Sequence, residues 1–109
     1  MANGRLGVGV SVAGSDVQIY QVPASGVLFA TVSINIVNKG VASGKVRVAL
    51  SLNATPDLAD YIEFDTEIAE NGGILERACK LLSPGERVII HADTNDFSIR
   101  VEGLEKTTT

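Results

Sequence analysis

The amino-acid sequence predicts an all-β fold: a single antiparallel β-sandwich of about eight strands, arranged as a jelly roll or as an immunoglobulin-like sandwich. Three observations predict it. Strand-like segments recur with turn residues between them, which is typical of sandwiches and barrels. The hydrophobic residues, 45% of the chain, are mostly Val, Ile, Leu and Ala, with three Phe, two Tyr and no Trp. The length of 109 residues suits one domain with its own core.

The first three strands are predicted at residues 6–13, 17–22 and 27–38, because each is followed by turn residues. Gly14-Ser15-Asp16 follows the first, the segment from Pro23 to Gly26 follows the second, and Lys39-Gly40 follows the third. A fourth strand is predicted at residues 45–52, where apolar and mostly polar residues alternate. The positions expected to face the core are Val46, Val48, Leu50 and Leu52.

A single helical turn is expected near residues 56–60, because Thr55 suits an N-cap and Pro56 suits the first helical position. Strands at residues 61–68 and 74–81 follow, joined by the turn Asn71-Gly72-Gly73. The last two strands, residues 87–92 and 96–102, are each preceded by a four-residue turn, at residues 83–86 and 93–96. On the strand 61–68 we expect Glu63, Asp65 and Glu67 to share one solvated face.

Three parts of the chain are distinguished: an N-terminal arm at residues 1–5, the sandwich at residues 6–105, and a flexible tail at residues 106–109, where Lys106 and three threonines have nothing to pack against. The strand edges admit two interpretations. In a monomer they need bulges or charges that prevent pairing, whereas in an assembled shell or fibre they can form the contact itself.

Composition argues against several classes of partner and location. The net charge of −4 repels nucleic acid and anionic membranes. The start of the chain lacks the pattern of a signal peptide, so we expect synthesis in a reducing cytoplasm, where the single cysteine stays free. Apolar runs are interrupted well below the roughly 18 residues of a membrane span, which predicts a soluble protein without membrane association.

Side chains that could carry chemistry are isolated. His91 is the single histidine and is expected to be half-exposed at a strand end, and Cys79 is expected to be a small buried hydrophobe in an apolar strand. The carboxylates lack the spacing of a calcium loop, which would supply roughly six to eight oxygens. We therefore expect no catalytic residue, no cofactor and no metal, and hence no enzyme.

Seven short motifs spread over nearly the whole chain carry a family resemblance. They are residues 5–7 (Arg-Leu-Gly), 20–23 (Tyr-Gln-Val-Pro), 32–40 (Val-Ser-Ile-Asn-Ile-Val-Asn-Lys-Gly), 61–65 (Tyr-Ile-Glu-Phe-Asp), 71–77 (Asn-Gly-Gly-Ile-Leu-Glu-Arg), 85–88 (Gly-Glu-Arg-Val) and 101–105 (Val-Glu-Gly-Leu-Glu). Together they resemble small virion proteins of tailed bacteriophages. A looser similarity to immunoglobulin-like adhesion modules rests on the turns at residues 38–40 and 84–86, although the cysteine pair and core tryptophan of antibody domains are missing.

The resemblance implies a structural component of the virion without enzymatic activity. The first hypothesis is a capsid decoration or cement protein, a homo-oligomer that binds the major capsid protein or other virion proteins. The alternative is a tail, neck or fibre component that contacts other virion proteins or a host surface through the loops at residues 53–60, 71–73 and 93–96. The residues expected to make protein contacts are Arg5, Leu6, Asn71, Gly72, Asp93 and Asn95.

Overall fold

Eight strands and one short turn of 3-10 helix make up the computed structural model, which describes residues 3–108. The elements are β1 (Asn3–Val10), β2 (Asp16–Gln21), β3 (Val27–Asn38), β4 (Gly44–Ser51), η1 (Leu58–Asp60), β5 (Tyr61–Ile68), β6 (Gly73–Leu82), β7 (Arg87–Ala92) and β8 (Phe97–Thr107). The predicted all-β class is confirmed, and the bounds predicted for β3, β5 and β7 are those observed.

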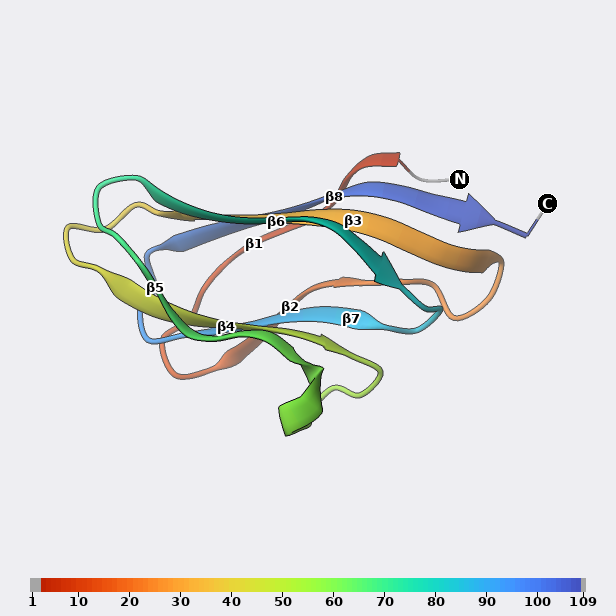
Figure 1. Cartoon of the computed structure of the whole chain (residues 1–109), viewed down its shortest axis with the longest axis horizontal. Helices are drawn as coiled ribbons and strands as arrows, with labels where there is room; N and C mark the ends of the chain where they lie inside the picture. The colour runs from red at the N-terminus through yellow and green to blue at the C-terminus, as the bar shows by residue number, and fades with distance from the viewer. Residues whose placement is uncertain (1–2, 109) are drawn as a thin grey trace.

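The strands form two antiparallel sheets of four strands, stacked as two layers (Figure 1). The first sheet has the order β1-β8-β3-β6 and the second has the order β2-β7-β4-β5. The pairs β1–β8, β2–β7, β3–β6 and β4–β5 are those of one long hairpin that has been rolled up, and the pairs β3–β8 and β4–β7 complete each sheet. This order is a jelly roll, which decides between the two arrangements that the sequence left open.

The core lies between the two sheets and consists mainly of Val and Ile side chains, as the composition predicts. Every second residue of β3 from Ala30 to Ile36 points inward and is almost fully buried, and Phe97 of β8 is the largest side chain that is fully buried. In β4, Val46 and Val48 are buried as predicted, but Leu52 lies beyond the strand and is 62% exposed. Sheet-on-sheet packing of this kind stabilises the fold by removing apolar area from water.

One polar pair joins the two sheets near the end that carries the termini. The hydroxyl of Tyr20 in β2 donates a hydrogen bond of 2.6 Å to the carboxylate of Glu105 in β8, and both residues are buried. Burial, assisted by the hydrogen bond to Glu105, raises the pKa of Tyr20 well above its usual range. The pair therefore satisfies two polar groups that the core would otherwise leave without partners.

All four edge strands are interrupted by bulges. An extra residue in β1 (Leu6) and one in β2 (Ile19) shift the register with the neighbouring strand. In β5 and β6 the bulges contain residues with positive φ, Asp65 at 55° and Cys79 at 59°. Bulges of this kind disturb the row of free hydrogen-bonding groups that a second chain would need. Of the two interpretations of the edges, the structure favours the one in which edge pairing is prevented.

Residues 3–5 of the expected arm and residues 106–107 of the expected tail lie in strands, which corrects this part of the prediction. Arg5, from the expected arm, pairs with Glu102 in β8, and Lys106, from the expected tail, pairs with Phe29 in β3. Because β3 begins as early as Val27, it offers a partner to β8 as far as Thr107. Residues 1, 2 and 109 of the expected arm and tail lie outside the described residues.

The helical turn also lies slightly later than predicted. It begins after Asp57, whose backbone N–H donates a hydrogen bond of 2.8 Å to the carboxylate of Asp60. The N-cap is thus Asp57 and not Thr55, because the carboxylate of Asp60, three residues later, accepts the hydrogen bond from the backbone N–H of Asp57. In Figure 1 the turn projects from the body on the side of the second sheet.

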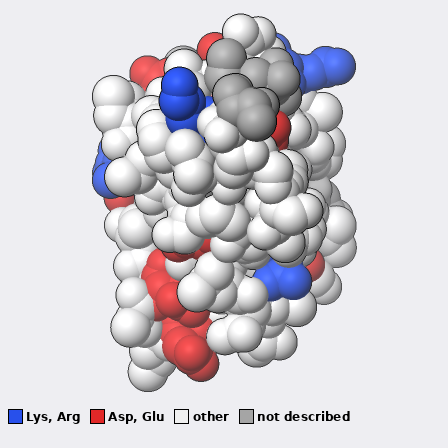
Figure 2. Space-filling view, turned by 90° about the vertical axis from the view of Figure 1, so that its right-hand side faces the viewer, with Lys and Arg blue, Asp and Glu red and all other residues white. Residues whose placement is uncertain are grey.

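The loops divide between the two ends of the sandwich. The β1–β2, β3–β4, β5–β6 and β7–β8 connections lie at one end, which we call the loop end. The other end carries both termini and the β2–β3 and β6–β7 connections, whereas η1, in the β4–β5 connection, projects nearer the middle of the long axis (Figure 1). Figure 2 shows this terminal end: acidic side chains gather in its lower part, on the side of the second sheet, and much of the surface above them is uncharged.

Candidate functional site

The outer face of the first sheet carries several exposed apolar side chains toward the loop end. Strand register places its side chains in two rows that cross all four strands. The first row is Val10, Ser98, Val37 and Ile74, and the second row is Val8, Arg100, Asn35 and Glu76. Val8, Val10 and Ile74 are about half exposed or more, at 55%, 49% and 63%. Large apolar side chains that are grouped in this way mark surfaces that contact a partner.

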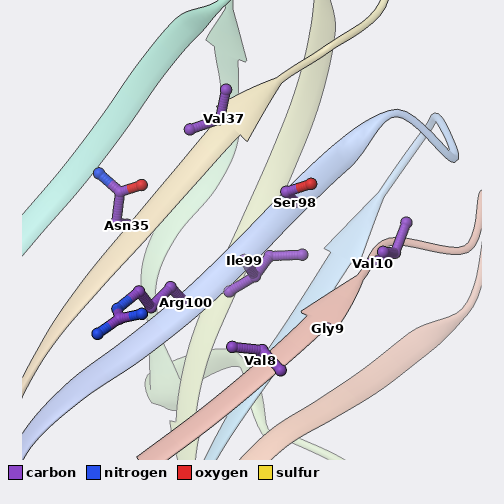
Figure 3. A pocket seen from close by; sticks show the side chains of 8 residues that line it. All are labelled: Val8, Gly9, Val10, Asn35, Val37, Ser98, Ile99 and Arg100. Atoms are coloured by element: carbon purple, nitrogen blue, oxygen red, sulfur yellow. The ribbon is translucent and has the colours of Figure 1, made fainter. Parts of the chain in front are cut away.

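A shallow hollow of 340 Å³ lies on this face above β8, and we call it the β8 hollow (Figure 3). Val8 and Val10 of β1 form one wall, and Val37 and Asn35 of β3 form the other. The hollow exists because Ser98, between Val10 and Val37, is too small to fill the space between the two walls. Arg100 supplies the charge in the lining, toward the end where Val8 and Asn35 lie.

The two valines of β1 face outward because the inner side of this strand has no room for side chains. A Cβ atom on Gly7 would overlap the backbone carbonyl of Ile19, whereas one on Gly9 would meet only the end of the Ile19 side chain, at 2.6 Å from its Cδ1 atom. Glycine is therefore required at position 7, where the backbone of β1 passes close to that of β2. This inverted pattern, glycine inside and valine outside, was the available sequence signal, but valines on an alternating strand are normally assigned to the core.

The outer face of the second sheet is different, because charged and polar side chains that pair with one another occupy its centre. Arg47 in β4 binds Asp65 in β5 at 2.7 Å, and its guanidinium lies 4.0 Å from the ring centre of Phe64. The hydrogen bond from Arg47 lowers the pKa of Asp65. Next to them Nδ1 of His91 lies 2.9 Å from the carboxylate of Asp16. A smaller hollow of 190 Å³ beside these groups is lined mainly by polar side chains.

The prediction that Glu63, Asp65 and Glu67 share one solvated face of β5 is wrong. The bulge at Phe64 and Asp65 turns Glu63 away from Asp65, toward the first sheet. Glu63 accepts hydrogen bonds of 2.6 Å from Arg77 in β6 and 2.8 Å from Thr66. Burial opposes the charged form of Glu63, but the hydrogen bonds from Arg77 and Thr66 outweigh it and the pKa of Glu63 is lowered. This contact joins the edge strands of the two sheets.

Cys79 and His91, the two side chains considered for chemistry, lie in different sheets. Cys79 is exposed, which corrects the prediction of a buried residue; the bulge in β6, where residues 78 and 79 oppose Ser33 alone, removes it from the alternation. His91 in β7 is partly exposed, as predicted, and its ring contacts Asp16. The structure does not bring Cys79 and His91 together in one strand pair or one hollow.

The six predicted contact residues fall into separate regions. Arg5 and Leu6 lie in β1, where Arg5 is exposed but Leu6 packs against the core at the bulge. The other four are exposed residues of the loop end, in the β5–β6 and β7–β8 connections: Asn71, Gly72, Asp93 and Asn95.

The loop-end residues also hold the loops together. The side-chain oxygens of Asp93 and Asn95 accept hydrogen bonds from the backbone N–H groups of Lys45 and Ala13 at 2.9 and 2.7 Å. Asn71 and Gly72 adopt positive φ angles of 59° and 95°, as a tight turn requires, and Gly72 donates its N–H to the carbonyl of Asn38. These residues thus fix the shape of the loop end whatever else they contact.

Within residues 3–108 no group of three or more His, Cys, Asp or Glu side chains is arranged to hold a metal ion. The helical part of the described chain contains no segment long and apolar enough to cross a membrane. The β8 hollow and the exposed apolar side chains beside it, Val8, Val10 and Ile74, are the candidate contact surface. No protein-family model, no curated protein and no solved structure matches the chain.

Proposed function

We propose that this chain is a non-enzymatic structural protein of a tailed-bacteriophage virion, and that it decorates the head by binding the major capsid protein. The observation that carries the proposal is the apolar outer face of the first sheet. In an antiparallel sheet that faces water on one side, alternate residues are expected to be polar. Here Val10, Val37 and Ile74 occupy one row of that side, with Ser98 between the two valines.

The edges support contact through a face and argue against contact through strand addition. A decoration protein could join a shell either by extending a sheet or by laying a surface on its neighbours. Since β1, β2, β5 and β6 are all bulged, the extension mode is disfavoured. An apolar patch with a polar rim has the composition of a protein interface, and repetition by symmetry makes many weak contacts sufficient.

The fold adds support by analogy. Jelly rolls are common among viral capsid domains, and they also occur in lectins and cupins. Fold alone does not determine function. The resemblance of seven motifs to phage virion proteins selects the first of these classes, and the scarcity of aromatic residues, 5% of the chain, argues against the sugar binding of lectins.

A tail, neck or fibre component is the second candidate. The observation that favours it is the gathering of four connections at the loop end, away from both termini. Binding residues are often carried by loops on a rigid β scaffold. In this case the partner would be another tail protein or a host surface.

The deciding experiment is cryo-electron microscopy of the phage particle whose genome encodes this chain. Density for an eight-strand jelly roll on the head lattice, with the first sheet against the capsid, is the expected result. Density confined to the tail or neck would replace the first proposal with the second. Mass spectrometry that finds the chain absent from purified particles would overturn both.

A further inference from the structure

We propose that the chain associates with itself head to tail, with the exposed Leu58 of one copy seated in the β8 hollow of the next. This inference does not depend on the virion proposal; a copy whose hollow holds Leu58 would contact the capsid through the rest of the outer face of the first sheet. It follows from an apolar projection and an apolar hollow that have complementary charges and lie on opposite parts of the same molecule.

Leu58 is the projection. Its side chain is 85% exposed, and no residue of η1 is buried. The turn is nevertheless held in shape: the N–H of Asp57 binds the carboxylate of Asp60 at 2.8 Å, and the N–H of Asp60 binds the carbonyl of Asp57 at 3.0 Å. A projection whose backbone is already ordered loses little conformational freedom when it binds. Burial of Leu58 against a second copy would remove apolar area that folding leaves in water.

The β8 hollow is a suitable receptor for such a side chain. Its walls are Val8, Val10 and Val37, and its volume of 340 Å³ is at the small end of the range for ligand pockets, about 300–1,000 Å³. The hollow is open and lies on a sheet surface, so it would enclose a small molecule poorly. It can, however, accept a branched side chain together with the residues that flank it.

The charged residues beside Leu58 and in the lining of the β8 hollow have opposite signs, which favours this pairing. Arg100 is the charged residue of the hollow lining, and Leu58 is flanked by Asp57 and Asp60. In the single chain Arg100 pairs with Glu102 at 3.2 Å, but both side chains are about half exposed, at 49% and 50%. An exposed pair of this kind contributes little to stability and can be exchanged. In the docked complex the carboxylates beside Leu58 would meet Arg100 in a less hydrated setting, where the attraction is stronger.

The positions of the two surfaces decide the type of assembly. The β8 hollow lies on the outer face of the first sheet, whereas Leu58 belongs to η1, which projects on the side of the second sheet. Contacts between two different surfaces are heterologous, so a pair of copies keeps one free Leu58 and one free hollow. Such contacts build a closed ring or an open filament.

Two variants test the proposal by complementation. Leu58→Ser removes the projection and keeps the hollow, and Ser98→Phe fills the hollow and keeps the projection. In light scattering and sedimentation velocity at protein concentrations up to about 1 mM, the dissociation constant of a weak contact, the wild type should show a mass that rises with concentration. Each variant alone should remain a monomer. Their equimolar mixture should form a species of twice the monomer mass and no larger one, because only one productive contact remains.

The matched control is Val41→Ser. Val41 is 88% exposed like Leu58, but it lies in the β3–β4 connection at the loop end and not in η1. This variant should associate like the wild type, and high salt should weaken the association of both. If Ser98→Phe has an altered circular dichroism spectrum, Arg100→Glu serves as the hollow variant. A wild type that stays monomeric, a mixture that fails to dimerise, or a Leu58→Ser variant that still associates would each overturn the proposal.

Discussion

The outer faces of the two sheets differ in how their side chains are used. On the second sheet, Arg47 and His91 contact the carboxylates of Asp65 and Asp16 in the same chain. On the first sheet, valines from β1 and β3 surround the β8 hollow and remain partly or half exposed. Both faces cover the same core, so the requirements of folding do not explain the difference. A face whose polar groups are already paired offers little to a partner, whereas apolar side chains left in water gain free energy from burial.

The edge strands of the two sheets, in contrast to the outer faces, are alike. Each sheet ends in strands that carry bulges, and both sheets are protected against extension in the same way. The outer faces are therefore the surfaces on which the two sheets differ. The following experiments test whether the face of the first sheet is an open surface or an extension of the core.

The largest effect is expected from a pair of neighbouring residues in β3. Ile36 points into the core and is 1% exposed, while Val37 points to the outer face beside the β8 hollow. Ile36→Ala should lower the free energy of unfolding by about 2–5 kcal/mol, because it leaves a cavity. Val37→Ser should lower it by less than about 1 kcal/mol, as is usual at the surface.

Urea denaturation followed by circular dichroism measures both values. If Val37→Ser costs as much as Ile36→Ala, the outer face is packed in the free chain and the comparison between the two faces fails.

A smaller effect is expected where the two sheets meet at Glu63 and Arg77. Arg77→Met should lower the free energy of unfolding at pH 7 by about 1–3 kcal/mol, since the carboxylate of Glu63, 12% exposed, loses its charged donor. Because Arg77 is 40% exposed, water can replace part of this interaction and the lower end of the range is expected. The control is Arg100→Met, whose pair with Glu102 is exposed and should contribute about 0–1 kcal/mol.

The same contact predicts a dependence on pH. The pKa of Glu63 is lowered from its usual 4.5 in the folded state, so the unfolded chain binds the proton more readily. The stabilisation is fully present above the usual pKa of 4.5 and disappears as the pH falls through the lower, folded value. The difference between wild type and Arg77→Met should therefore be constant near neutral pH and shrink below about pH 4.5. A difference that grows on acidification would contradict the role given to Glu63.

Local patterns predicted the strands well, because alternation and turn residues are properties of short segments. They failed where the end of a strand depends on contacts with residues that are distant in the sequence. The valines of β1 suggested a strand through Ala13, but Ser11 is buried and bonded to the carbonyl of Thr94, which ends the strand at Val10. The extension of β8 to Thr107 depends on its pairing with Val27, which lies 80 positions earlier in the chain.

The candidate site was beyond prediction for the same reason. The β8 hollow is formed by three strands whose register is set by long-range pairing, and the alternation of glycine and valine in β1 was the one local signal. The bulges at Asp65 and Cys79 had no sequence signal of their own beyond the tolerance of Asp for positive φ. The choice of a jelly roll also required the pairing order, which periodicity does not contain.

The smallest expected effect concerns the bulge that closes the edge of the first sheet. Cys79 is exposed and has a φ of 59°, a conformation that costs an ordinary residue roughly 1–2 kcal/mol and costs glycine nothing. Glycine also has more freedom to lose on folding, by about 0.5–1 kcal/mol. Cys79→Gly should therefore change the free energy of unfolding by less than about 1 kcal/mol, toward greater stability. Cys79→Val should lower it by about 1 kcal/mol, because a β-branched residue is strained at positive φ.

Denaturation curves of the two variants, with hydrogen exchange of the β6 amides, measure the effect. Both variants should stay free of aggregation, since the extra residue of the bulge is retained. A Cys79→Val variant that is more stable than the wild type would show that β6 can adopt a regular edge. In that event the edge of the first sheet, and not its outer face alone, would be available to a second chain.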